Sequence, residues 1–72
     1  MLNTEEFGRR LAHLRRQSGK KQREVADELG VTPQAVSKWE RGLSCPEILM
    51  LDDLSSSLGV SIAELFSKNE AR

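Results

Sequence analysis

Glycine divides this chain into short segments, and that punctuation limits what the chain can fold into. Gly19, Gly30, Gly42 and Gly59 each follow a stretch whose apolar residues recur every three or four positions. That spacing lines one face of an α-helix. No stretch of the sequence alternates apolar and polar residues as a half-buried strand does. We therefore predict an all-α fold, a compact bundle of five short helices.

Capping residues place the ends of the first three helices. Thr4 is predicted to cap the first helix, because a side-chain oxygen there accepts a bond from a free backbone N–H. The second helix is expected over residues 22–29, with Gly30 as the left-handed residue that ends it. Thr32 is predicted to cap the third helix. Pro33 suits the first position of that helix, where a missing N–H does no harm.

Two further capping patterns predict the last two helices. Ser44 and Glu47 have the spacing of a capping box, with Pro46 in the first turn of the fourth helix. Gly59 ends that helix, whose buried stripe is predicted to be Ile48, Leu51, Leu54 and Leu58. A second capping box begins the fifth helix, and its residues are Ser61 and Glu64, followed by the apolar residues Ile62, Leu65 and Phe66.

The length and composition indicate one globular domain. A chain of 72 residues, 38% hydrophobic and 31% charged, has the composition of a folded domain. We expect one domain over residues 1–68 and a frayed tail at residues 69–72. Cys45 has no partner for an intrachain disulfide, and no apolar run approaches the roughly 20 residues of a membrane span. We therefore expect a cytoplasmic protein with no membrane contact.

The charge of the chain is balanced in total but not along its length. The formal net charge is zero, yet residues 1–41 contain nine Lys or Arg and six Asp or Glu. Residues 42–72 contain two bases and five acids. This distribution favours the approach of the N-terminal part to a polyanion. The alternative interpretation is two solvated surfaces of different sign.

The third predicted helix, residues 33–41, has two unlike faces. At 100° per residue, Val36 and Trp39 lie on one side and point into the fold. The opposite side carries two cations, an amide and a hydroxyl with no acid among them, namely Gln34, Ser37, Lys38 and Arg41. A helix that only covers a core usually mixes both signs of charge on its wet side. The polar face therefore suggests a polyanionic ligand.

The spacing between Gln22 and Trp39 is specific enough to suggest a family. Ala26 lies four residues after Gln22, Gly30 four after Ala26, and Val36 six after Gly30. This pattern resembles the helix-turn-helix of the phage repressor and Cro family, also called the xenobiotic-response-element family. The likeness extends from about residue 7 to about residue 66 through the runs WERG, LGVS and AELF. It implies a lambda-repressor-like bundle in which helices 2 and 3 form the motif.

The resemblance implies which residues meet DNA. In the family, the third helix enters the major groove and the start of the second rests on the phosphate backbone. The positions that match base contacts are Pro33, Gln34, Ser37 and Lys38. Gln suits adenine and Lys suits guanine, whereas Pro33 offers only packing against a thymine methyl. The positions that match phosphate contacts are Gln22 and Arg41. Arg23 and Lys21 are added as candidates whose alternative role is to solvate the turn.

The resemblance also implies roles inside the fold. In the family, the positions of Arg15 and Glu40 hold a partly buried ion pair that links the first and third helices. The packing of the motif is assigned to Ala26, Gly30, Val36 and Trp39. Lys21 stands where the family often has a hydroxyl cap, so we expect a weaker cap at the start of the second helix.

These observations predict a sequence-specific regulator of transcription that binds double-stranded DNA. We expect a repressor that reads the major groove with helix 33–41 and binds an inverted-repeat operator as a homodimer, at least on DNA. Leu65 and Phe66 are the predicted apolar contributors to the dimer surface. The alternative is an antitoxin or adaptor that uses the same fold to hold a protein partner.

Residues for catalysis and metal binding are scarce. The chain has one His, one Cys and no Tyr. Neither a nucleophile motif nor the paired Cys and His spacing of a zinc site is present. We therefore expect no enzyme activity, no metal and no cofactor.

Overall fold

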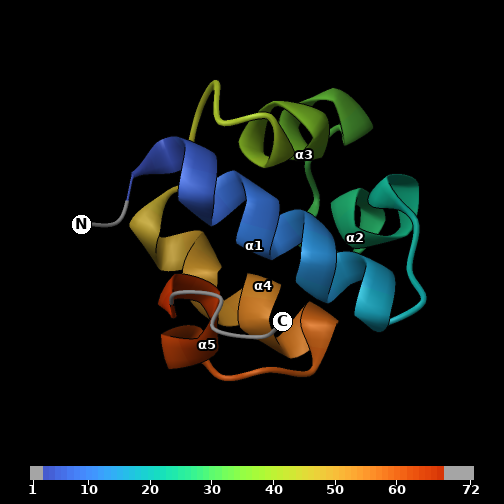
Figure 1. The fold of residues 1–72 in the computed structure, drawn as a ribbon. Helices are drawn as coiled ribbons and strands as arrows, with labels where there is room; N and C mark the ends of the chain where they lie inside the picture. The colour runs from blue at the N-terminus through green and yellow to red at the C-terminus, as the bar shows by residue number, and fades with distance from the viewer. Residues whose placement is uncertain (1–2, 68–72) are drawn as a thin grey trace.

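The prediction of an all-α fold is confirmed. A computed structural model describes residues 3–67, in which every regular element is helical (Figure 1). The elements in chain order are α1 (Thr4–Gln17), α2 (Gln22–Leu29), α3 (Pro33–Glu40), the 3₁₀ turn η1 (Ile48–Met50), α4 (Leu51–Leu58) and α5 (Ile62–Phe66). The end of the domain predicted at residue 68 and the tail at residues 69–72 lie outside the described residues.

Helix α1 runs through the middle of the bundle. It has α2 and α3 on one side and α4 and α5 on the other (Figure 1). It packs against α3 and α5, while α2 packs against α3 and α4. None of the helices in the described part is long and apolar enough to cross a membrane. Helix α1 therefore links α3 to α5.

The core takes a fully buried side chain from every α-helix. These side chains are Leu11, Val25, Val36, Leu54 and Leu65. Each such burial stabilises the fold by about 1.5–3 kcal/mol relative to exposure. Trp39 is also buried, which confirms the inward face predicted for α3.

The prediction of Thr4 as the first helix cap is wrong. Asn3 is the capping residue, and its Oδ1 accepts a hydrogen bond from the Glu6 N–H at 2.8 Å. Thr4 is the first residue of α1. Asn ranks above Thr as an N-cap residue.

The predicted start of the fourth helix is also wrong. Ser44 and Glu47 form no capping box, and residues 43–47 have no regular structure. The chain remains extended at Glu47, with ψ of 151°, before η1 and α4 begin. Pro46 disfavours helical backbone at the residue before it, which delays the start. As a result Ile48 lies outside the buried stripe and is 78% exposed, while Leu54 and Leu58 are buried as predicted.

Gly8 allows α1 to lie unusually close to the end of α3. A Cβ at this position would be 2.5 Å from the Trp39 carbonyl oxygen and 2.6 Å from the Glu40 carbonyl oxygen. The neighbouring atoms belong to the backbone, so no side-chain rotation would relieve the contact. This approach sets the distance between α1 and the C-terminal end of α3. Sequence reasoning overlooked it, although a glycine between Phe7 and Leu11 in a helical pattern was a signal.

Candidate nucleic-acid interface

The turn between α2 and α3 is held by backbone and cap hydrogen bonds. The Val31 N–H donates to the Ala26 carbonyl at 3.0 Å and the Gly30 N–H donates to the Asp27 carbonyl at 3.3 Å. This pair of bonds is a Schellman motif, which requires the left-handed backbone of Gly30, whose φ is 73°. The Thr32 Oγ1 then accepts from the Ala35 N–H at 3.1 Å. The predicted end of α2 and the predicted start of α3 are therefore confirmed.

The packing between the two helices is tight. Ala26 and Val36 have no exposed surface, and the buried Trp39 lies on the same side of α3 as Val36. A small residue at Ala26 leaves room for α3 to approach α2, and Val36 fills the junction. The polar face of α3 is consequently held at a definite angle to the start of α2.

The residues predicted to meet DNA lie on the outer side of this motif. Gln34, Lys38 and Arg41 are exposed, while Pro33 and Ser37 are half-buried. Lys21 and Arg23 at the start of α2 are exposed as well. The outer face of α3 thus presents an amide, a hydroxyl and two cations, groups that can donate to base edges and phosphates.

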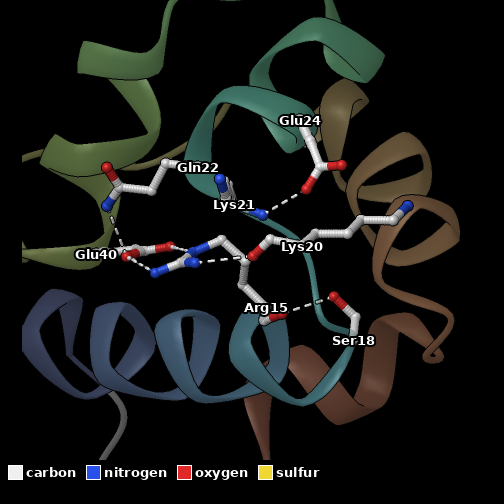
Figure 2. A network of polar contacts seen from close by, with 7 residues as sticks. All are labelled: Arg15, Ser18, Lys20, Lys21, Gln22, Glu24 and Glu40. Atoms are coloured by element: carbon white, nitrogen blue, oxygen red, sulfur yellow. Dashed lines mark hydrogen bonds and ion pairs between the residues drawn. The ribbon is translucent and has the colours of Figure 1, made fainter.

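An ion pair between Arg15 and Glu40 connects α1 to α3 (Figure 2). The Arg15 Nε donates to Glu40 Oε2 at 2.5 Å, and Nη2 donates to Oε1 at 3.1 Å. The remaining Nη1 donates to the Lys20 carbonyl at 2.9 Å, in the turn before α2. The side chains are 14% and 7% exposed, so the pair is shielded from solvent. One guanidinium therefore positions α3 and the turn that leads into α2.

Gln22 joins the same network from the first residue of α2. Its Nε2 donates to Glu40 Oε1 at 2.9 Å, and Figure 2 shows its side chain directed at that carboxylate. The resemblance implied that this amide meets a phosphate. In the structure one amide hydrogen is engaged with Glu40. Gln22 thus joins the start of α2 to the end of α3.

Lys21 and Lys20, which flank this turn, have different surroundings. The Lys21 N–H donates to Glu24 Oε1 at 2.7 Å, so a glutamate compensates in part for the missing side-chain cap. The Lys20 Nζ donates to Glu28 at 2.8 Å and to the Ser57 carbonyl at 2.6 Å. Hydrogen bonds from Lys20 and from the Ser57 hydroxyl hold the pKa of Glu28 below its ordinary value. Lys20 therefore ties α2 to α4 and is not free for a ligand.

Sequence reasoning missed two arginines next to this face. A depression of about 540 Å³ lies between α1, α2 and α3, and Arg9, Arg16 and Arg41 line it together with Gln22 and Ser37. Arg9 and Arg16 are exposed and come from the same side of α1. Their spacing of seven residues, two helical turns, was the available signal. Among residues 3–67, no three His, Cys, Asp or Glu side chains lie close enough together to hold a metal ion.

The buried junction, the left-handed turn and the polar outer face together define a helix-turn-helix protein. The helix-turn-helix family matches residues 11–65, and the chain belongs to that family. It is 39% identical over 66 residues to the SPβ prophage-derived HTH-type transcriptional regulator YonR of Bacillus subtilis, covering 92% of this chain and 61% of the relative. It is 37% identical to the HTH-type transcriptional activator BcrR of Enterococcus faecalis, covering 90% of this chain and 32% of BcrR.

A solved structure shares the whole fold. The restriction-modification controller protein C.AhdI from Aeromonas hydrophila superimposes with a TM-score of 0.82 at 30% identity, over 88% of this chain and 96% of that chain. The chain spans about three fifths of YonR and about one third of BcrR. The shared region is therefore the helix-turn-helix domain.

Proposed function

We propose that this protein is a sequence-specific regulator of transcription that binds double-stranded DNA and reads the major groove with α3. The observation that carries the proposal is the exposed polar face of α3, with Gln34 and Lys38 outward and Val36 and Trp39 buried. Relatives named as transcriptional regulators support it. They also support the expectation that the chain is not an enzyme.

The proposed contacts divide into base readout and backbone positioning. Gln34 and Lys38 donate to purine edges, Ser37 donates to a base or phosphate, and Pro33 packs on a thymine methyl. Backbone contacts come from Arg41 and from the start of α2, where the residues are Gln22, Lys21 and Arg23. The N-terminal end of α2 favours an anion because its free N–H groups and dipole point outward.

We further propose that the protein acts on an inverted-repeat operator as a homodimer. One domain of this size reads only a few base pairs, and two copies related by a dyad would read both half-sites. Leu65 has no exposed surface and belongs to the monomer core, so it is not part of the dimer surface. Phe66 is 40% exposed and packs on Phe7 with ring centroids 5.3 Å apart.

The exposed apolar surface of η1 is a better dimer surface. Ile48 is 78% exposed and Leu49 is 87% exposed, beside a groove of about 410 Å³ lined by Phe7, Pro46 and Phe66. Exposed aliphatic side chains next to an apolar groove are typical of a protein interface. We assign this surface to the second copy because it leaves the polar face of α3 free.

The proposed mode of regulation is repression in the cytoplasm, by occupation of the operator. A compact domain that covers a promoter excludes other proteins from it. A reporter gene with the operator overlapping its promoter should be silenced when the protein is expressed. Increased expression from that reporter would contradict repression, as would an operator whose occupation changes nothing.

A second candidate function is that of an antitoxin or protein-binding adaptor. The exposed side chains of Ile48 and Leu49 favour it, because the same surface could hold a different protein. The two functions differ in their affinity for DNA. An adaptor would bind duplexes weakly and without sequence preference, whereas a regulator discriminates strongly between sequences.

The experiment that tests the proposed function is selection of duplexes from a random pool, followed by a salt titration. We expect one enriched site with dyad symmetry, bound at least about 1,000-fold more tightly than unrelated duplex. The logarithm of affinity should fall steeply with the logarithm of salt concentration. Failure to enrich any sequence would contradict the proposal and favour the adaptor.

A further inference from the structure

The depression between α1, α2 and α3 is a basic surface that extends from the helix-turn-helix motif onto α1. Three arginines line it, Arg9 and Arg16 from α1 and Arg41 after α3. Within residues 3–67, none of the three takes part in an ion pair. Their charges therefore face solvent at the side of the motif.

The one carboxylate in the depression is already neutralised. Glu40 also lines it, but its side chain is 7% exposed and accepts two bonds from Arg15 and one from Gln22 (Figure 2). The buried pair contributes little field outside the protein because its two charges nearly cancel. The depression is consequently positive toward a ligand that approaches from solvent.

The position of the depression connects it to the proposed DNA face. Ser37, which belongs to the polar face of α3, lines it, and so does Gln22 at the start of α2. The contact of Gly8 with the last carbonyl groups of α3 brings Arg9 close to this end of the helix. A strand that rests on the start of α2 therefore passes next to α1.

We infer that Arg9 and Arg16 of α1 are additional DNA-backbone residues, each binding a phosphate of the strand that passes over the start of α2. The inference rests on the proposed function. Seven residues of α-helix span about 10.5 Å, so the two side chains are spaced to meet different phosphates of one strand. Arginine suits this role because its planar group donates two parallel bonds to phosphate oxygens.

The test compares Arg9→Gln and Arg16→Gln with a control on the same helix. Arg10 is the control, because its Nε donates to the Glu64 carbonyl at 3.0 Å and so faces α5 rather than the depression. Each variant loses one positive charge, and thermal melting establishes that each is folded. Affinity is then measured against salt concentration on the selected duplex and on an unrelated duplex.

We expect Arg9→Gln and Arg16→Gln each to lower the salt slope by about 0.9, equally on both duplexes. Arg10→Gln should leave the slope unchanged. The conservative variants Arg9→Lys and Arg16→Lys should restore it, since the slope counts charges that meet phosphates. Such uniform losses are the signature of backbone contact rather than base readout.

Three results would overturn the inference, and one of them separates it from the proposed function. If the salt slopes of Arg9→Gln and Arg16→Gln equal that of the wild type, the proposed phosphate contacts of α1 are wrong. DNA binding by the protein would still stand. An equal loss in Arg10→Gln would show that net charge alone is responsible. A wild-type protein with no salt-dependent affinity for duplex would instead contradict the proposed function itself.

Discussion

Lys38 and Arg41 are three positions apart at the end of α3 and have different proposed roles. Lys38 is exposed on the outer face, in the row that includes Gln34. Arg41 is the C-cap residue and lines the basic depression beside α1. We propose that Lys38 meets base edges and that Arg41 meets the DNA backbone, although both carry the same charge.

This difference predicts distinct effects of removing each side chain. Lys38→Ala should cost about 1–3 kcal/mol on the selected site and relax the preference at one or two base pairs. Gln34→Ala should behave in the same way. Arg41→Ala should weaken binding to every duplex alike and lower the salt slope by about one. Affinity on the selected and random duplexes decides between these roles. Identical behaviour of Lys38→Ala and Arg41→Ala would contradict the division.

Glu40 shows how one side chain can organise several segments. Its two carboxylate oxygens accept from Arg15 on α1 and from Gln22 on α2, while its backbone belongs to α3. Removing one partner of such a shielded pair costs more than the 0–1 kcal/mol typical of an exposed pair, because the other charge is left stranded. The geometry of the motif thus depends on one carboxylate whose hydrogen bonds are all made within the protein.

At the scale of the elements, the distance between α1 and α3 depends on Gly8. In the interior of a helix, Ala is preferred to Gly by about 1 kcal/mol. A Cβ here would lie 2.5 and 2.6 Å from two backbone oxygens, which opposes that preference, because α1 must move away from α3 to admit a methyl group. Overpacking of this kind costs about 1–3 kcal/mol.

We therefore predict that Gly8→Ala destabilises the protein despite the better helix former. The expected net loss is up to about 2 kcal/mol, measured by urea denaturation. Ser56→Ala on α4 is the control, since Ser56 is exposed and the change affects helix preference alone. A Gly8→Ala protein more stable than the wild type would show that α1 shifts at no cost.

At the scale of the whole molecule, polar and apolar surfaces are segregated. The motif and the basic depression lie on α1, α2 and α3, while the exposed apolar side chains of Ile48 and Leu49 belong to η1. The groove beside η1 is lined by Phe7 and Phe66, from the two ends of the described chain. This separation lets one molecule contact DNA and a second copy at the same time.

The dimer proposal predicts the stoichiometry of the complex with DNA. Two copies should bind an inverted repeat with their α3 helices about 34 Å apart, one turn of B-DNA. The double substitution Ile48→Glu and Leu49→Glu should give a one-to-one complex of lower affinity. It should leave the melting temperature nearly unchanged, because both side chains are exposed. Analytical ultracentrifugation and footprinting measure these outcomes.

The control for this prediction is Ser56→Glu, which adds a negative charge at an exposed position on α4. It should leave the two-to-one complex intact. A wild-type complex of one copy on a site without dyad symmetry would contradict the dimer. That result would leave the proposed reading of DNA by α3 unaffected.

Local chemistry allowed much of this protein to be predicted from its sequence. Thr32, Pro33 and Gly30 act within a few residues of their own positions, so the ends of α2 and α3 were predictable. The inward face of α3 followed from the spacing of Val36 and Trp39, because helical periodicity is a property of the chain alone. The resemblance to a family supplied the pairing of Arg15 with Glu40, which spacing could not.

Contacts between distant segments decided the remainder. Ile48 and Leu65 have similar apolar side chains, yet one is 78% exposed and the other is fully buried. The exposure of Ile48 depends on where α4 begins, and the burial of Leu65 depends on how α5 packs against α1. Arg9 and Arg16 line one depression with Gln22 and Ser37 because α1 packs closely against the end of α3 at Gly8. Sequence determines which face of a helix is apolar, whereas tertiary packing determines what that face meets and which polar groups become neighbours.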